Sequence, residues 1–216
     1  MFTIVLAEDH HVVRQGLRSL LETSLDCQVV GEAADGRSAI GLVEQFHPTV
    51  LVVDILMPQL NGLDVIRRTR DICPQTRIVV LSMYADEGYV REALIAGATA
   101  YVLKEARADE FVHAIREAIN GRRYLSAPLS ERVIDAYVQR LDSPTLDPYD
   151  ALTDRERMIL HLSAQSYTSA EIAERLAISS RTVEGHRASL MRKLALRNQT
   201  DLLRYAFRRG IIRLDE

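Results

Sequence analysis

The sequence contains only two cysteines and no long apolar segment. Cys27 and Cys73 lie far apart without the spacing of metal ligands, so we expect reduced, packed thiols that have no functional role. No apolar run approaches the roughly 18 residues that a membrane-spanning helix needs, and the first residues lack the basic start of a secretory signal. We therefore expect a soluble, cytoplasmic protein that has no membrane partner.

Lysine is also scarce, because only Lys104 and Lys193 are lysines among the 27 basic residues. Arginine supplies almost every other positive charge. A retained lysine indicates a site that needs a compact ammonium rather than a planar guanidinium. The alternative is that two lysines have been kept by chance.

Acidic and basic residues are distributed unevenly along the 216 residues, whose net charge is −3. Residues 149–216 contain 12 basic and 9 acidic residues, a net charge of +3, which leaves −6 for residues 1–148. A chain of this length can form one large domain or two small ones. The asymmetry predicts an acidic first domain and a basic second domain that binds a polyanion.

The first 120 residues alternate short β-branched runs with helical apolar patterns, which is typical of repeated βα units. We predict an α/β fold with a five-stranded parallel, doubly wound (βα)5 sheet, followed by a small all-α domain. The run Val50–Val53 is apolar throughout, as expected for a strand buried on both faces. The strands are predicted at residues 3–7, 28–33, 50–53, 77–81 and 100–103.

The connection between the two domains is predicted from its breakers. Residues 121–148 should form a partly helical linker, with a helix over residues 129–141 and a proline-containing break over residues 142–148. The first domain would then cover residues 1–120 and the second residues 149–216.

The second domain has a purely helical pattern. Thr153 and Glu156 have the spacing of a capping box at the start of its first helix, which should bury Met158, Ile159 and Leu162. Two further helices with a short break between them are typical of a helix-turn-helix unit. They are predicted at residues 169–176 and 180–194, before a last helix at residues 200–209.

Chemically active side chains follow four of the predicted strands. The carboxyl ends of parallel strands lie at one edge of a sheet, so these residues should converge although they are far apart in sequence. Several carboxylates together favour a hard divalent cation, and Mg²⁺ suits them. A carboxylate can also attack a phosphoryl group while Mg²⁺ and an ammonium neutralise the charge. The residues are Glu8, Asp9, Asp54, Ser82 and Lys104.

Taken singly, these residues have simpler explanations. Asp54 alone would be a helix cap or turn residue, and Ser82 a loop hydroxyl. His10 and His11 beside the acidic pair could suggest a transition-metal site, but no cysteine or further histidine has ligand spacing. We place them in the first turn of a helix and assign them no role. Only the five-residue combination favours a phosphate site.

The motif residues of the first domain are, in order, Glu8-Asp9, Asp54 with Met57-Pro58 and Gly62, then Ser82, and Tyr101 through Lys104. This order resembles the receiver domain of bacterial response regulators, which has a CheY-like fold. The resemblance implies that Asp54 accepts a phosphoryl group from a sensor histidine kinase, while Lys104 and the Ser82 hydroxyl contact the phosphoryl oxygens.

The same resemblance implies a metal site and a switch. Mg²⁺ would be held by Asp9, Asp54 and the backbone carbonyl of Leu56, with Glu8 acting mainly through water. Tyr101 matches the switch aromatic, which turns inward when Ser82 moves toward the phosphate. Without the resemblance, Tyr101 would be a half-buried strand aromatic.

The motif residues of the second domain are Leu152 through Glu156, Glu171 through Ala173, Ser179 through Arg187 and Met191 through Leu194. They resemble LuxR-type DNA-binding domains, and the whole chain resembles a two-component response regulator of the NarL/FixJ type. One feature departs from the pattern: the turn before the first motif helix usually carries a glycine, and residues 165–168 contain none. The resemblance implies sequence-specific binding to double-stranded DNA.

The recognition helix is expected to enter the major groove with its N-terminal half, while later basic residues bind phosphates and set the register. The alternative for these charges is a solvated helix face. Val183, Leu190 and Leu194 should face the core, and Gly185 allows either close approach to DNA or tight packing. The residues near the bases are Arg181, Thr182, Glu184, His186 and Arg187, and those near the phosphates are Arg192, Lys193 and Arg197.

We therefore predict a regulator in which phosphorylation of Asp54 frees or dimerises the DNA-binding domains, so that a homodimer reads two half-sites and controls transcription. The chain would not be an enzyme, apart from Mg-dependent self-phosphorylation and dephosphorylation at Asp54. An apolar stripe on the last helix is a candidate dimer surface or, alternatively, a core face. It consists of Leu202, Leu203, Ala206 and Phe207.

Two other functions remain open on the sequence alone. A small phosphohydrolase would use Asp54 as nucleophile but would need a general acid two residues later, where Leu56 stands. A DNA-binding regulator could also carry a receiver-like domain that is not phosphorylated. Whether the unphosphorylated recognition helix is covered by the receiver or free on the linker is open as well.

Overall fold

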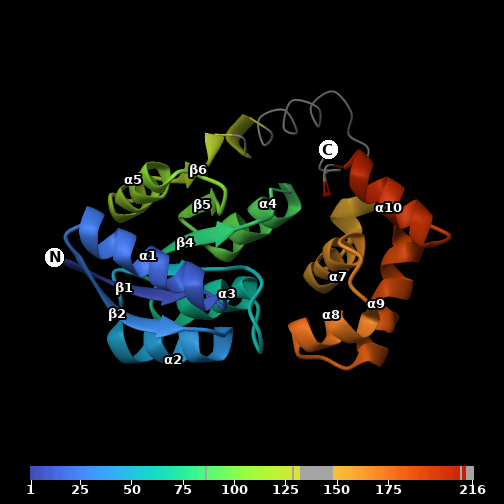
Figure 1. The fold of residues 1–216 in the computed structure, drawn as a ribbon, viewed down its shortest axis with the longest axis horizontal. Helices are drawn as coiled ribbons and strands as arrows, with labels where there is room; N and C mark the ends of the chain where they lie inside the picture. Colours follow the sequence, from blue (N-terminus) through green and yellow to red (C-terminus); the bar gives the residue numbers. More distant parts are fainter. Residues whose placement is uncertain (86, 128, 132–147, 210, 213–216) are drawn as a thin grey trace. The chain divides into compact units, whose positions relative to one another are not determined.

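The structure is a computed structural model, and it describes residues 1–85, 87–127, 129–131, 148–209 and 211–212. The chain divides into two compact units, Met1–Arg132 and Val133–Glu216 (Figure 1). The division groups the described residues just after Asn120 with the first unit. Beyond Glu131, the helix predicted over residues 129–141 lies outside the described residues.

The first unit contains one parallel sheet, which confirms the predicted α/β class. The first five strands begin and end within one residue of the predicted positions, and the described sheet has a sixth, two-residue strand that was not predicted. The order across the sheet is β2-β1-β3-β4-β5-β6. The strands are β1 (Phe2–Ala7), β2 (Cys27–Ala33), β3 (Val50–Val53), β4 (Arg77–Ser82), β5 (Ala100–Leu103) and β6 (Tyr124–Leu125).

Helices cover both faces of this sheet. Val50 and Val52 belong to a core that includes Leu21 of α1 and Ile115 of α5. Leu51, on the alternate face of β3, is equally buried, on the side where α2 packs against α3 and α3 against α4. A continuous apolar strand is what burial on both faces requires. The helices are α1 (His11–Ser24), α2 (Gly36–Phe46), α3 (Gly62–Ile72), α4 (Glu87–Ala96) and α5 (Ala108–Ile119).

All the described secondary-structure elements of the second unit are helices. Its first α-helix begins with the predicted capping box, in which Thr153 and Glu156 each bond the other's backbone N–H, and Met158, Ile159 and Leu162 are buried as expected. No described helix of the chain is long and apolar enough to cross a membrane. The elements are the 3-10 helix η1 (Pro148–Ala151), α7 (Asp154–Ala164), α8 (Ser169–Leu176), α9 (Ser180–Lys193) and α10 (Gln199–Arg208).

The turn between α7 and α8 forms without a glycine. Ser166 takes the position in the left-handed region, with a φ of 67°. An L-residue there loses roughly 1–2 kcal/mol relative to a right-handed conformation. Ser166 in place of a glycine therefore strains the turn, but the turn still forms. The next helix starts at once with a second capping box, formed by Thr168 and Glu171.

Candidate functional site

The sheet places the acidic residues of the first unit beside each other. Ala7 of β1 pairs with Val53 of β3 at the carboxyl ends of the two strands. Their next residues, Glu8 and Asp54, therefore leave the sheet at neighbouring points, and the Asp54 amide donates to the Ala7 carbonyl at 2.9 Å.

Lys104 joins the two carboxylates. Its Nζ lies 2.7 Å from Oδ2 of Asp54 and 2.7 Å from Oε2 of Glu8. Both acids are removed from solvent, because Glu8 is 1% exposed and Asp54 is 6% exposed. The structure thus brings together three of the five predicted site residues, from three different strand ends.

The electrostatics of this cluster leave Asp54 poorly stabilised as an anion. Burial raises the pKa of Asp54 to about 6, against the opposing attraction of Lys104, and the charges of Glu8 and Asp9 push in the same direction as burial. Burial of the Lys104 ammonium lowers its pKa, but Asp54 and Glu8 outweigh this effect and the pKa is raised overall. The ammonium stays charged at neutral pH.

Asp9 lies at the more open side of the cluster, together with a residue to which the sequence assigned no role. The imidazole Nδ1 of His10 lies 2.8 Å from Oδ1 of Asp9 and 3.1 Å from Oε1 of Glu8. Glu8, Asp9 and His10 each offer a ligand atom within 4.8 Å of the others. His10 follows the acidic pair directly, so adjacency in the sequence was the available signal.

The loop after Asp54 is held tightly against it. The Leu56 amide donates to Oδ1 of Asp54 at 3.3 Å, and α3 begins at Gly62 behind its cap, Asn61. A Cβ on Gly62 would lie 2.2 Å from the carbonyl oxygen of Asp54. Only glycine fits this approach without a backbone shift. The loop thus turns back directly into α3.

Ser82 and Tyr101 meet at one peptide segment. The Ser82 hydroxyl accepts from the Tyr84 amide at 3.1 Å, and the Tyr101 hydroxyl donates to the Tyr84 carbonyl at 2.7 Å. Both Ser82 and Tyr101 are fully buried, so Tyr101 points inward in this structure. The Tyr84 ring also contacts the ring of Tyr89, with centroids 5.3 Å apart. Sequence reasoning did not single out either of these two tyrosines.

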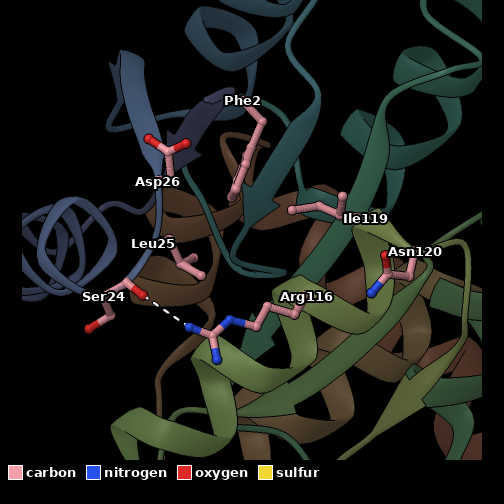
Figure 2. Close-up of a pocket in the computed structure, with 7 residues that line it drawn as sticks. All are labelled: Phe2, Ser24, Leu25, Asp26, Arg116, Ile119 and Asn120. Atoms are coloured by element: carbon pink, nitrogen blue, oxygen red, sulfur yellow. Dashed lines mark hydrogen bonds between the residues drawn. The ribbon is translucent and has the colours of Figure 1, made fainter.

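At the opposite edge of the sheet there is a shallow pocket of about 290 Å³ near the start of β1. Figure 2 shows that residues from α1, β1 and α5 form it, and the Arg116 guanidinium donates to the Ser24 carbonyl at 3.2 Å. No predicted site residue reaches it. The lining consists of Phe2, Ser24, Leu25, Asp26, Arg116, Ile119 and Asn120.

In the second unit, α8 and α9 form the predicted helix-turn-helix pair. Ser179 caps α9 by accepting from the Thr182 amide at 3.1 Å. Val183, Leu190 and Leu194 are buried as predicted. The predicted DNA contacts of this helix lie on its exposed or half-buried faces, namely Arg181, Thr182, Glu184, His186, Arg187, Arg192 and Lys193, and Arg197 is exposed just after it.

Two of these side chains already have partners within the unit. The Arg187 guanidinium donates to Oε1 of Gln199, whose amide nitrogen donates to the Ser163 carbonyl at 3.1 Å. Lys193 donates to Oε2 of Glu156 at 2.7 Å and to the Ala151 carbonyl at 2.9 Å. The sequence did not indicate either pairing, because each joins residues distant in the chain.

The structure distinguishes between the two roles predicted for Gly185, close approach to DNA or tight packing, and between the two predicted for the α10 stripe, a dimer surface or a core face. A Cβ on Gly185 would meet no atom within 4 Å, so tight packing within the unit does not explain this glycine. Leu202 and Ala206 are fully buried in their own unit, which contradicts a dimer role for these two residues. Leu203 is half-buried and Phe207 is 51% exposed, so the outer half of the stripe remains a candidate surface.

Comparison with known proteins agrees with this architecture. Residues 4–116 match the family described as response regulator receiver domain, and residues 150–206 match the family described as bacterial regulatory proteins, luxR family. The oxygen regulatory protein NreC of Staphylococcus aureus is 37% identical over 213 residues, which cover 97% of this chain and 98% of NreC.

Solved structures show the same two-domain organisation. RcsB from Salmonella enterica serovar Typhimurium, bound to promoter rprA in the presence of phosphomimetic BeF3⁻, is 25% identical with a TM-score of 0.65, and the match covers 94% of this chain and 97% of RcsB. Another RcsB structure, with two dimers bound to two parallel DNAs, is 26% identical with a TM-score of 0.57 over 94% and 96% of the two chains. The chain belongs to the two-component response regulators, with a receiver domain followed by a LuxR-type DNA-binding domain.

Proposed function

We propose that this chain is a phosphorylation-switched transcription regulator in which Asp54 accepts a phosphoryl group from a sensor histidine kinase. The observation that supports it most is the position of the Lys104 ammonium, 2.7 Å from the carboxylates of both Asp54 and Glu8 at the carboxyl edge of the sheet. Such an ammonium can follow the negative charge from the carboxylate to the transferred group.

In the proposed transfer, a carboxylate oxygen of Asp54 attacks the phosphorus of a phosphohistidine. The new O–P bond forms as the P–N bond breaks, and the imidazole nitrogen keeps the electron pair and takes up a proton. Lys104 and the Ser82 hydroxyl would hold the phosphoryl oxygens. The product is an aspartyl phosphate, so the chemistry is transient and requires no other substrate.

We further propose that Mg²⁺ binds beside Asp54. The donors suit it, because Glu8, Asp9 and Asp54 offer hard oxygen atoms. A cation beside Asp54 would offset the burial and the charges of Glu8 and Asp9 that raise its pKa. Asp9, Asp54 and the Leu56 carbonyl would hold the ion, with Glu8 acting through water. When bound, the ion would neutralise charge on the transferring phosphoryl oxygens.

Ser82 and Tyr101 are proposed as the switch. Both bond to the peptide segment of Tyr84, one to its amide and the other to its carbonyl. A phosphoryl group that draws the Ser82 hydroxyl toward Asp54 would therefore shift the backbone to which Tyr101 is bonded. This couples the chemistry to the loop between β4 and α4.

The proposed output is binding of double-stranded DNA, for which we propose α9 as the contacting helix; the similar RcsB structures contain bound DNA. A DNA target implies a cytoplasmic location. The outer half of the α10 stripe, Leu203 and Phe207, would contribute to a homodimer that places two α9 helices on two half-sites. Arg181, Thr182, Glu184, His186 and Arg187 would lie at the bases. Arg192 and Arg197 would lie at the phosphates, where the sequence also predicted Lys193.

The test of the input is labelling with a small phosphodonor. The full chain and Asp54→Asn are incubated with acetyl phosphate and Mg²⁺, and intact mass is measured. We expect one phosphoryl group on the wild type, none on Asp54→Asn, and none on either in EDTA. Asp71→Asn, an exposed carboxylate of α3, serves as the matched control and should behave like the wild type. Equal incorporation by Asp54→Asn would refute the proposed acceptor.

A further inference from the structure

Lys193 stands in the last turn of the recognition helix α9, and its ammonium points into its own unit. Nζ donates to Oε2 of Glu156 at 2.7 Å and to the Ala151 carbonyl at 2.9 Å. Two of its three N–H donors are therefore used inside the protein. The side chain is only 30% exposed, whereas its neighbour Arg192 is exposed.

The partner of Lys193 is itself part of a helix end. Glu156 is 3% exposed, and the same Oε2 accepts from the Thr153 amide at 2.7 Å as half of the α7 capping box. Through one buried carboxylate, Lys193 joins the end of α9 to the start of α7. Through the Ala151 carbonyl it also reaches the end of η1.

The presence of a lysine rather than an arginine at position 193 agrees with these contacts inside the unit. Lys193 is one of two lysines among 27 basic residues, and both donate to a buried carboxylate. A phosphate contact on the helix surface would be served equally well by arginine, which this chain uses elsewhere. A compact ammonium that must reach one carboxylate oxygen and one carbonyl is the case in which lysine and arginine differ.

We propose that Lys193 is a positioning residue that fixes the C-terminal end of α9 and thereby the direction in which this helix enters the DNA groove, rather than a phosphate contact. This inference rests on the proposed DNA-binding role of α9. A helix of 14 residues is about 21 Å long, so a tilt of roughly 10° at its anchored end moves its first turn by nearly 4 Å. Base-edge hydrogen bonds tolerate about half an ångström.

The experiment compares Lys193→Met with Arg192→Met in the full chain. The probes are a duplex that the wild type has selected from a random-sequence library and a scrambled duplex of equal length. Dissociation constants are measured for both at several salt concentrations. For Arg192→Met, a phosphate contact, we expect similar weakening on both duplexes and a salt slope smaller by about 0.9.

For Lys193→Met we expect a different signature. Affinity for the selected duplex should fall roughly tenfold or more, the value of a lost base contact, while the scrambled duplex and the salt slope change little. Equal weakening on both duplexes with a slope smaller by about 0.9 would show a phosphate contact and overturn the inference. Unchanged affinity for the selected duplex would overturn it as well.

Thermal unfolding and a second variant serve as controls for a loss of folding. Lys193→Met leaves the buried Glu156 carboxylate without its cation, so Glu156→Gln is combined with it to remove that charge. The double variant should melt higher than Lys193→Met alone and show the same loss of selectivity at unchanged slope, and wild-type selectivity in it would also overturn the inference. If the wild type selects no duplex from the library, the proposed DNA-binding function itself is wrong. This outcome differs from failure of the Lys193 inference, in which the wild type does select a duplex and only the behaviour of Lys193→Met departs from the expected one.

Discussion

The two lysines of the chain make nearly the same contact, but the net pKa shifts of the two carboxylates that they bond are opposite. Lys104 lies 2.7 Å from Asp54 in the receiver, and Lys193 lies 2.7 Å from Glu156 in the DNA-binding unit. Yet the pKa of Asp54 is raised to about 6, while the pKa of Glu156 is lowered to about 2. An ammonium at hydrogen-bond distance therefore does not by itself determine the state of a buried carboxylate.

The difference lies in how far burial is offset by the other groups around each acid. Burial opposes ionisation of Glu156, but hydrogen bonds from Lys193, Ser189 and the Thr153 backbone outweigh it. For Asp54, burial is the largest effect and Lys104 does not outweigh it, because Asp54 shares this ammonium with Glu8 and has the charge of Asp9 nearby. A fully bonded carboxylate stabilises the fold, whereas an under-bonded one is left available for a new partner such as a cation or a phosphoryl group.

The largest effect that we expect is on Glu156. Its pKa lies below the unfolded value of 4.5, so its ionised form stabilises the fold above about pH 4.5, and this contribution is lost as the pH falls toward 2. Glu156→Gln should lower the free energy of unfolding of the DNA-binding unit by about 3 kcal/mol at pH 7 and by much less at pH 3. Urea unfolding at both pH values measures this, with the exposed Glu174→Gln as control. A loss that is the same at both pH values would contradict the comparison.

A slightly smaller effect of opposite sign is expected at Asp54. Its folded pKa of about 6 lies above the unfolded value of 3.8, so stability declines as the pH rises from about 4 to 6 and the anion forms. Asp54→Asn should therefore raise the free energy of unfolding of the receiver by up to about 3 kcal/mol at pH 7, in EDTA, and hardly at pH 3.5. Calorimetry at the two pH values tests the sign. A less stable Asp54→Asn at pH 7 would break the comparison between the two lysine sites.

The smallest change in unfolding free energy is expected for a helical glycine in each of the two units. A Cβ on Gly41 of α2 or on Gly185 of α9 would meet nothing within 4 Å. Both Gly→Ala variants should thus gain roughly 0.5–1 kcal/mol in unfolding free energy from helix propensity. Only Gly185→Ala should also weaken binding to a selected duplex, because it adds a methyl group to the face toward DNA. Equal DNA affinity for Gly185→Ala and the wild type would remove the close-approach explanation.

Local patterns predicted the elements and the edge at which they meet. Apolar runs such as Val50–Val53 and the Thr153/Glu156 spacing carry their own structural signal, and sheet topology then brings Glu8, Asp54 and Lys104 together. The two-residue strand β6 is too short to show any period. The Thr168/Glu171 capping box had a readable spacing and was missed.

Pairings between distant segments could not be read from the chain. Lys193 was predicted as a phosphate contact because it lies in a basic helix, but its partner Glu156 is 37 residues away. The sequence likewise predicted an apolar face on α10, but it did not show which residues of that face are buried in the unit and which are exposed. Leu202 and Ala206 turn into the core, and Phe207, one position on, turns out. Burial depends on neighbours that periodicity does not specify.

β6 also decides where a receiver can be separated from the rest of the chain. It pairs with β5, and the residue after it, Ser126, donates its amide to the Tyr101 carbonyl at 3.1 Å while its hydroxyl accepts from the Leu103 amide at 3.3 Å. A fragment that stopped at Asn120, the predicted boundary, would expose β5 as an edge strand, and unpaired edges recruit other chains. A receiver fragment intended to stay monomeric must therefore retain β6 and Ser126, which belong to the first unit.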